Sequence, residues 1–268
     1  MLIDTHSHLN FSDFDKDREE IIEKCLKNRI WIINVGIDYQ TSRKAVEISR
    51  KYKQGVYAAV GLHPLNFKKK FDYKEYKKLA SDSKVVAIGE IGLDYYYKPK
   101  TKRKLEVFKE GQKELLLKQL KLAKELDLPI ILHCRLALDD MLTILKSNIQ
   151  YLKPNLPGII HCFTGNLEQL DEFLRMGFFI GFNGIIFKQI SGIDFEILIK
   201  RTPLKRILIE TDCPYLLPPE FSEKRNNPFG VKLVAEKIAS IKGISFEDLS
   251  KITTENAITL FGLFSESS

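Results

Sequence analysis

Eight short apolar runs recur along the chain, with charged segments between them. The runs occupy residues 2–6, 30–36, 56–61, 85–92, 129–134, 158–163, 178–184 and 206–212. Most of them are continuously apolar and do not alternate with polar residues. Strands that are covered on both faces have this character, as in parallel sheets with helices on each side. The pattern therefore favours a parallel sheet covered by helices.

The segments between the runs have the periodicity of amphipathic helices. In residues 15–28, for example, Ile21, Ile22 and Cys25 share one face. Further helices are expected at 40–53, 74–82, 104–127, 137–147, 166–176, 230–242 and 245–262, the last with Ser245 as its N-cap. Gly111 lies inside 104–127, where a glycine lowers helix stability and permits a local break.

Eight strands alternating with helices predict an α/β fold of the (β/α)8 or TIM-barrel type. A doubly wound open sheet is the main rival. No GxGxxG motif follows the first run, which disfavours the nucleotide-binding form of that rival. No low-complexity linker interrupts the alternation, so residues 1–268 are expected to form one domain.

Composition narrows the class of protein further. Hydrophobic residues make up 44% of the 268 residues, enough for a large core. The formal net charge is +7, which suits an anionic partner such as nucleic acid or simply a lysine-rich surface. The four cysteines form no CxxC pair, and no run approaches the length of a membrane span. We expect a soluble cytoplasmic protein with reduced thiols, without membrane attachment, N-terminal processing or an obligate protein partner.

All five histidines and three acids lie at or just after the ends of apolar runs. They are His6, His8, Glu90, His63, His133, His161, Glu210 and Asp212. A TIM barrel gathers the carboxyl ends of its strands on one face, where active sites are built. Imidazoles and carboxylates gathered there predict a divalent-metal site, because buried acids are costly unless they are paired or metal-bound.

The first two histidines, His6 and His8, stand two residues apart. Side chains at such spacing on a strand point to the same side, so both imidazoles are expected to reach one point. For any single histidine, a satisfied place in the core or a loop is the commoner explanation. The metal-site interpretation depends on all five occurring at strand ends together.

The motifs DTHSH, GLHP, GEIGLDYY, HCR, HCFTG, ETDCPYL and RNNP follow one another in this order. With them the chain resembles the TatD family of metal-dependent deoxyribonucleases, from residue 2 to the TTENAITLFGL segment. The resemblance implies an amidohydrolase-like TIM barrel that hydrolyses phosphodiester bonds of DNA. It also implies two divalent metal ions, Mg²⁺, Mn²⁺ or Zn²⁺, that activate a water molecule.

The resemblance also implies roles for single residues. His6 and His8 match the pair that holds one metal, Glu90 the carboxylate that bridges two metals, and His133 and His161 the ligands of the second metal. Asp212 matches a metal-contacting aspartate and is expected to act with Glu90 in catalysis, as the general base for water. Substrate contacts are implied for His63, Arg135 and Arg225.

Functional roles are also expected for two further acids and for one basic segment. Glu210 is expected to orient a histidine ligand, and Asp4 either to do the same or to bind a backbone N–H group. The segment 68–78 is rich in lysine, and its cations are expected either to hold DNA or to form a solvated helix face. Phe71, Tyr73 and Tyr76, or residues 95–97, are expected either to stack on unpaired bases or to pack beneath the helix face.

Two other functions remain open at this point. Several amidohydrolases act on small amides or lactones and bridge their metals with a carboxylated lysine. The run 85–92 contains no lysine and has Glu90 near its end, which favours phosphodiester hydrolysis. A non-enzymatic metal- or nucleic-acid-binding scaffold ranks last, because it needs neither a bridging acid nor a base.

Overall fold

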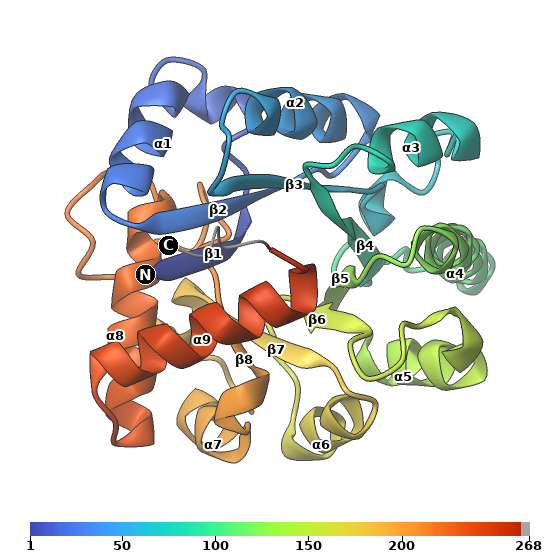
Figure 1. The fold of residues 1–268 in the computed structure, drawn as a ribbon. Helices are drawn as coiled ribbons and strands as arrows, with labels where there is room; N and C mark the ends of the chain where they lie inside the picture. The colour runs from blue at the N-terminus through green and yellow to red at the C-terminus, as the bar shows by residue number, and fades with distance from the viewer. Residues whose placement is uncertain (264–268) are drawn as a thin grey trace.

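The computed structural model describes residues 1–263, and its eight parallel strands form a nearly closed barrel (Figure 1). The strands are β1 (Leu2–Ser7), β2 (Ile30–Val35), β3 (Val56–Val60), β4 (Val85–Asp94), β5 (Ile130–Arg135), β6 (Gly158–Ile160), β7 (Phe179–Phe182) and β8 (Ile207–Ile209). They pair in sequence order, which confirms the predicted TIM barrel and excludes the open doubly wound sheet.

Helices follow the strands and cover the outside of the barrel. They are α1 (Arg18–Lys27), α2 (Tyr39–Arg50), α3 (Tyr73–Ala80), α4 (Lys102–Glu125), α5 (Leu138–Ser147), α6 (Leu167–Arg175), α7 (Phe195–Arg201), α8 (Val231–Lys242) and α9 (Phe246–Phe261). Ser245 caps α9 as expected, accepting a hydrogen bond from the Asp248 N–H. The sequence analysis missed α7, because seven residues are too few to show helical periodicity.

The long helix α4 runs without interruption, so the local break considered at Gly111 does not occur. A Cβ atom at Gly111 would lie 2.6 Å from the ring of Phe67. The missing side chain of Gly111 therefore lets α4 pack closely against the segment after β3. The packing offsets the lower helix propensity of glycine.

The barrel has two apolar layers. One lies between the strands and the surrounding helices, and the other fills the barrel interior, where it includes Ile3, Ile33 and Ile131. Helix α9 contributes Leu260 and Phe261 to the interior layer and lies across one end of the barrel (Figure 1). The amino ends of the strands are thus covered, and the polar site lies at their carboxyl ends.

Register shifts in β1 and β4 set the direction of the site residues. The pairing of β1 with β2 shifts between Asp4 and Ser7, and that of β4 with β5 shifts between Ile88 and Ile91. Ile3 points into the barrel before the first shift, and His6 points inward after it. A shift of this kind changes which alternate residues face the interior.

The last strand meets the first at the carboxyl end of the barrel. Ser7 forms a parallel bridge with Cys213, and the Asp212 N–H donates to the carbonyl of His6 at 2.8 Å. Asp212 is therefore joined to β1 through its backbone. A membrane-spanning helix is not found among residues 1–263, since none of their helices is both long and apolar enough.

Candidate metal centre

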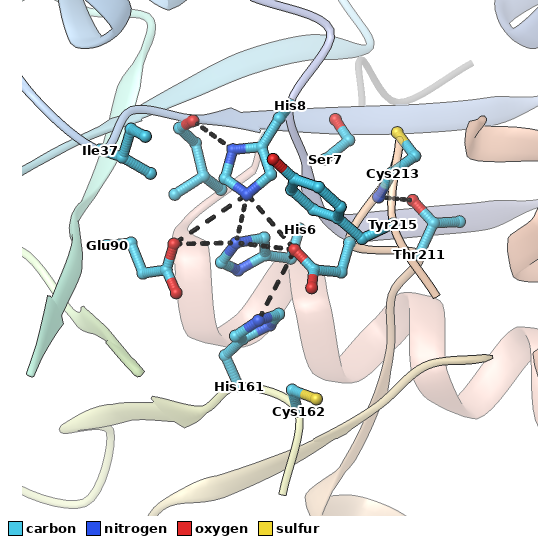
Figure 2. A network of polar contacts seen from close by, with 12 residues as sticks. His6, Ser7, His8, Ile37, Glu90, His161, Cys162, Thr211, Cys213 and Tyr215 are labelled. Atoms are coloured by element: carbon cyan, nitrogen blue, oxygen red, sulfur yellow. Dashed lines mark hydrogen bonds and ion pairs between the residues drawn. The ribbon is translucent and has the colours of Figure 1, made fainter. Parts of the chain in front are cut away.

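Imidazoles and carboxylates from distant parts of the chain gather at the carboxyl ends of the strands. Figure 2 shows the rings of His6, His8 and His161 and the carboxylate of Glu90 around one point. Among residues 1–263, three groups have their ligand atoms within 4.8 Å of one another: His6, His8 and Asp212; His6, His161 and Glu210; and His63, Glu90 and His133. The predicted convergence of strand ends is therefore present.

The first group brings two imidazole nitrogens face to face. Nε2 of His6 lies 3.2 Å from Nε2 of His8, and Oδ1 of Asp212 lies 3.3 Å from the His8 nitrogen and 3.8 Å from that of His6. Spacing of two residues thus directs both rings to one point, as expected. Two nitrogen donors and an anionic oxygen form a set that suits a divalent cation.

Glu90 turns its two oxygens toward different groups of histidines. Oε2 lies 3.6 Å from Nε2 of His6 and 4.0 Å from Nε2 of His8. Oε1 lies 2.8 Å from Nδ1 of His133 and 3.8 Å from Nε2 of His63. A carboxylate in this position is able to bridge two cations.

His161 gathers with His6 and Glu210 in a separate group. Its ring stacks on that of His6 with centroids 3.5 Å apart, and its Nε2 lies 3.8 Å from Oδ1 of Asp212. Its Nδ1 lies 2.7 Å from Oε1 of Glu210. His133 gathers with Glu90 and His63, and the metal expected to be shared by His133 and His161 stays a prediction.

Contacts on the outer ring nitrogens decide which nitrogen of each histidine faces the centre. Nδ1 of His8 donates to the carbonyl of Val35 at 2.8 Å, which leaves the Nε2 lone pair toward His6. Nε2 of His133 donates to Oδ2 of Asp94 at 3.0 Å, which leaves its Nδ1 toward Glu90. Metal-binding histidines usually have such outer partners. Sequence reasoning missed Asp94, although it stands four residues after Glu90 in the GEIGLD motif.

Acidic neighbours dominate the electrostatics of the centre. Burial lowers the pKa of His161, but Glu210 and Asp212 outweigh it and raise that pKa to about 10. Burial likewise lowers the pKa of His133, and Asp94 and Glu90 raise it to about 9. Burial raises the pKa of Glu90, yet the surrounding histidines hold it well below its ordinary value. The carboxylates make the centre attractive to positive charge.

The residues present fit divalent cations. The inner donors are imidazole nitrogens and carboxylate oxygens, which are ligands of Zn²⁺, Mn²⁺ and similar ions. Nδ1 of His6 and Oε2 of Glu210 are buried and have no hydrogen-bond partner among the described residues. Unpartnered polar atoms are costly in a protein interior, and here they border a cation-binding donor set.

His63 differs from the other histidines in its hydrogen bonding. The Leu65 N–H donates to Nδ1 of His63 at 3.2 Å, so the neutral ring carries its proton on Nε2. Burial, followed by the charge of His133, lowers the pKa of His63 to about 4, and the ring is neutral near pH 7. Its Nε2–H faces the centre as a hydrogen-bond donor. The expected contact of His63 with substrate stays a prediction.

The two arginines expected near substrate have different surroundings. Arg135 is exposed, and its guanidinium carbon lies 3.7 Å from the ring centroid of Tyr96. Arg225 instead pairs with Asp17 at 2.5 Å and lies over the ring of Phe14 at 4.0 Å. Its guanidinium is engaged in holding two loops together. The structure thus leaves Arg135 available and Arg225 occupied.

Buried polar contacts hold the segment that carries Asp212. Asp212 has a φ of +58°, a left-handed conformation that costs a non-glycine residue about 1–2 kcal/mol. Nδ2 of Asn226 donates to the carbonyls of Thr211 and Tyr215, at 3.1 and 2.7 Å. Sequence reasoning missed Asn226, although it belongs to the RNNP motif.

The two additional acids have separate roles. Glu210 lies against His161 and also accepts the Cys162 N–H at 2.7 Å, in agreement with the expected orientation of a histidine. Asp4 accepts hydrogen bonds from the N–H groups of His6 and Thr211, at 3.3 and 2.8 Å. Of its two expected roles, Asp4 therefore has the backbone one.

The segment 68–78 forms mainly a paired helix surface. Lys69, Lys70 and Lys77 pair with acids at 2.8, 3.1 and 2.5 Å. Tyr76 is buried, and Phe71 stacks on it with centroids 4.6 Å apart. Of the two expectations for Tyr76, the structure therefore selects packing, because the ring is part of the core beneath α3.

Comparison with known proteins agrees with this geometry. Residues 3–262 match the family model described as TatD related DNase. The chain is 42% identical to the uncharacterized metal-dependent hydrolase YabD of Bacillus subtilis, over 97% of this chain and 99% of that protein. It is 32% identical to the 3'-5' ssDNA/RNA exonuclease TatD of Pectobacterium atrosepticum, over 98% of this chain and 100% of that protein.

A solved structure extends the likeness to the fold. The crystal structure of YJJV, a TatD homolog from Escherichia coli, superposes with a TM-score of 0.86 at 30% identity, covering 98% of each chain. Sequence and fold agree over nearly the whole length. The chain therefore belongs to the TatD related DNase family of metal-dependent hydrolases.

Proposed function

We propose that this protein is a deoxyribonuclease that hydrolyses phosphodiester bonds of DNA with two divalent cations. The observation that carries the proposal is the position of Glu90, whose two oxygens face separate histidine groups. A relative of similar length is named as a 3'-5' ssDNA/RNA exonuclease, which supports nucleic acid as the substrate class.

The cations would be held by two groups that share Glu90. His6, His8 and Asp212 lie around one position, and His133 lies beside the other, where His161 is expected to complete the ligands. Divalent cations bound there supply Lewis-acid activation of water and neutralise charge on the phosphate.

The remaining steps belong to the side chains. Asp212 has one oxygen near three histidines, and its pKa lies below the ordinary value: burial raises it, but the neighbouring imidazoles outweigh burial. As an ionised carboxylate it accepts the proton of the attacking water. The Nε2–H of His63 and the guanidinium of Arg135 stabilise the negative charge that develops on the phosphoryl oxygens.

The state of the four cysteines supports a proposal for the cellular compartment of the protein. Cys25, Cys134, Cys162 and Cys213 are all free thiols. Burial raises the pKa of the Cys25 thiol, which keeps that group protonated. Free, protonated thiols suit a reducing compartment, so we place the enzyme in the cytoplasm.

The first test is hydrolysis of single- and double-stranded DNA with Mg²⁺, Mn²⁺ or Zn²⁺, with and without chelator. We expect cleavage that stops on metal removal, and cleavage that survives full removal would exclude the mechanism. Hydrolysis of small amides or lactones in place of DNA would favour the alternative amidohydrolase function.

The second test exchanges single residues. Asp212→Asn should lower the turnover number by about 10²- to 10⁴-fold, the usual contribution of a general base. His133→Ala should lose turnover together with bound metal, measured by elemental analysis. Asp171→Asn, which removes a surface ion pair with Arg201, is the control. Wild-type turnover in Asp212→Asn at equal metal content would refute the assigned role.

A further inference from the structure

The connection between β4 and α4 leaves directly from the metal centre. Asp94, the last residue of β4, contacts His133 through its side chain and is paired in register with Arg135 of β5. Arg135 follows His133 by two residues, which places it about 7 Å farther along the strand. Residues of the connection between β4 and α4 therefore lie beside the place where the reacting end of a bound substrate would be.

The connection begins with three tyrosines in different surroundings. Tyr95 is buried and donates its hydroxyl to Asp140 at 2.9 Å, which anchors the base of the connection. Tyr96 and Tyr97 are 51% and 67% exposed, and their rings meet at 89° with centroids 4.7 Å apart. The guanidinium of Arg135 lies on the ring of Tyr96. Exposed aromatic rings beside an arginine are suited to stacking with bases.

Unpaired cations follow the tyrosines. They are Lys98, Lys100, Lys102, Arg103 and Lys104, all of them exposed. Within residues 1–263 none of these five forms an ion pair with an acid at 4 Å or less, whereas three lysines of the segment 68–78 do. Cations without an acidic partner are the ones free to bind phosphates.

We propose that Tyr96, Tyr97, Arg135 and the five cations form a strand platform, which binds single-stranded nucleic acid next to the metal centre. Unpaired bases reach the exposed rings, and the backbone phosphates reach the cations. Duplex bases are stacked on each other and do not offer their faces to these rings. The inference rests on the proposed function, since it assigns the binding surface for the same substrate.

The charge part is tested by binding of a fluorescein-labelled twelve-nucleotide oligothymidylate, measured by fluorescence anisotropy in chelator at several salt concentrations. The platform variant carries Lys98→Gln, Lys100→Gln, Lys102→Gln, Arg103→Gln and Lys104→Gln. Its control carries Lys68→Gln, Lys69→Gln, Lys70→Gln, Lys74→Gln and Lys77→Gln, and removes the same number of positive charges. We expect the salt slope to fall by roughly 0.7 for each phosphate that the platform variant no longer binds, and to change little in the control.

The stacking part is tested with an abasic oligonucleotide of the same length. We expect the wild type to prefer the base-bearing strand, and Tyr96→Ala to weaken binding of that strand by about 5- to 150-fold. Tyr96→Phe keeps the ring and should keep the preference. Binding of the two strands with equal affinity by the wild type, or undiminished binding by Tyr96→Ala, would overturn the stacking role.

The outcomes separate the platform from the proposed function. An equal decrease of affinity in the two charge variants would assign the effect to net charge and overturn the platform, even if the wild type cleaves DNA. Binding that depends on the platform in a wild type that hydrolyses no DNA with any of the metals would support the platform as a binding surface and overturn the proposed function.

Discussion

The outer nitrogens of three site histidines contact protein oxygens. The partner is a backbone carbonyl for His8 and a carboxylate for His133 and His161. A partner of this kind fixes the ring orientation and directs the other nitrogen inward. A carboxylate partner also makes the inner nitrogen more basic. We therefore expect side chains outside the candidate ligand set to contribute to cation affinity.

Asp94 offers a direct test of this contribution. Asp94→Asn keeps an oxygen that accepts the His133 N–H but removes the negative charge. We expect cation affinity to fall by about 10- to 100-fold, measured by calorimetric titration with Mn²⁺ and Zn²⁺. Asp171→Asn loses a surface carboxylate and should leave the affinity unchanged. Unchanged affinity in Asp94→Asn would show that the hydrogen bond alone suffices.

Gly181 of β7 makes room for Glu210. A Cβ atom at Gly181 would lie 2.5 Å from Oε2 of Glu210 and 3.0 Å from Ile159. Gly181→Ala should therefore lower the free energy of unfolding by about 1–3 kcal/mol, measured with urea, and displace the carboxylate from His161. Adding Glu210→Asp, which shortens the side chain, should restore part of the stability. No recovery in the double variant would place the clash elsewhere.

Among the elements, α4 holds one side of the metal centre through two buried glutamines. The Gln112 side chain accepts the Asp94 N–H at 2.9 Å and donates to the Asp94 carbonyl at 3.0 Å. Gln119, seven residues later on the same face, binds the N–H and carbonyl of Leu62 at 2.7 and 3.0 Å. Leu62 precedes His63. The helix thus positions the backbone beside both His63 and His133.

If α4 positions the backbone beside the centre, replacing Gln112 should change the affinity for cations as well as the stability of the fold. Gln112→Met leaves two buried backbone groups unsatisfied, at a cost of about 1–3 kcal/mol for each group, and should weaken cation binding by about tenfold. Asn256→Leu is the matched control, because Asn256 binds the carbonyls of Leu204 and Ile207 away from the centre. We expect both variants to unfold at lower urea concentration. An equal decrease of cation affinity in the two would contradict a specific role for α4.

On the scale of the molecule, the candidate centre connects six of the eight strands. Its side chains come from the ends of β1, β3, β4, β5, β6 and β8. A ligand that binds only the folded barrel stabilises it by mass action. Cation binding at this centre therefore also reports whether the barrel is folded.

Metal removal should lower the melting temperature of the whole barrel. At a free concentration one hundred times the Kd, one bound cation contributes about 2.7 kcal/mol. For a chain of this size we expect a rise of roughly 5–10 °C over the chelated protein, measured by scanning calorimetry. Glu90→Gln should lose most of this rise. A melting temperature that is the same in Mg²⁺, Mn²⁺, Zn²⁺ and chelator would exclude the centre as a cation site.

The sequence by itself predicted the barrel and the histidines and acids of the candidate centre, although not their partners Asp94 and Asn226. Eight buried runs separated by amphipathic helices predict parallel strands, and the carboxyl ends of such strands lie on one face. Because His6, Glu90 and Asp212 each end a run, their convergence follows from topology alone. The order of the seven motifs along the whole chain also indicated the family.

Tertiary structure decided how the members are grouped. Register shifts in β1 and β4 change which residues face inward, and alternation along a strand does not reveal them. They turn His6 and Glu90 inward, where the two side chains face each other. Likewise, lysines of 68–78 and of 98–104 look alike in sequence, and neighbouring elements supply the acids that Lys69 and Lys77 meet. The periodicity of apolar residues predicts which side chains share a face of one helix or strand. Contacts between side chains depend on the distances between elements that are far apart in the chain.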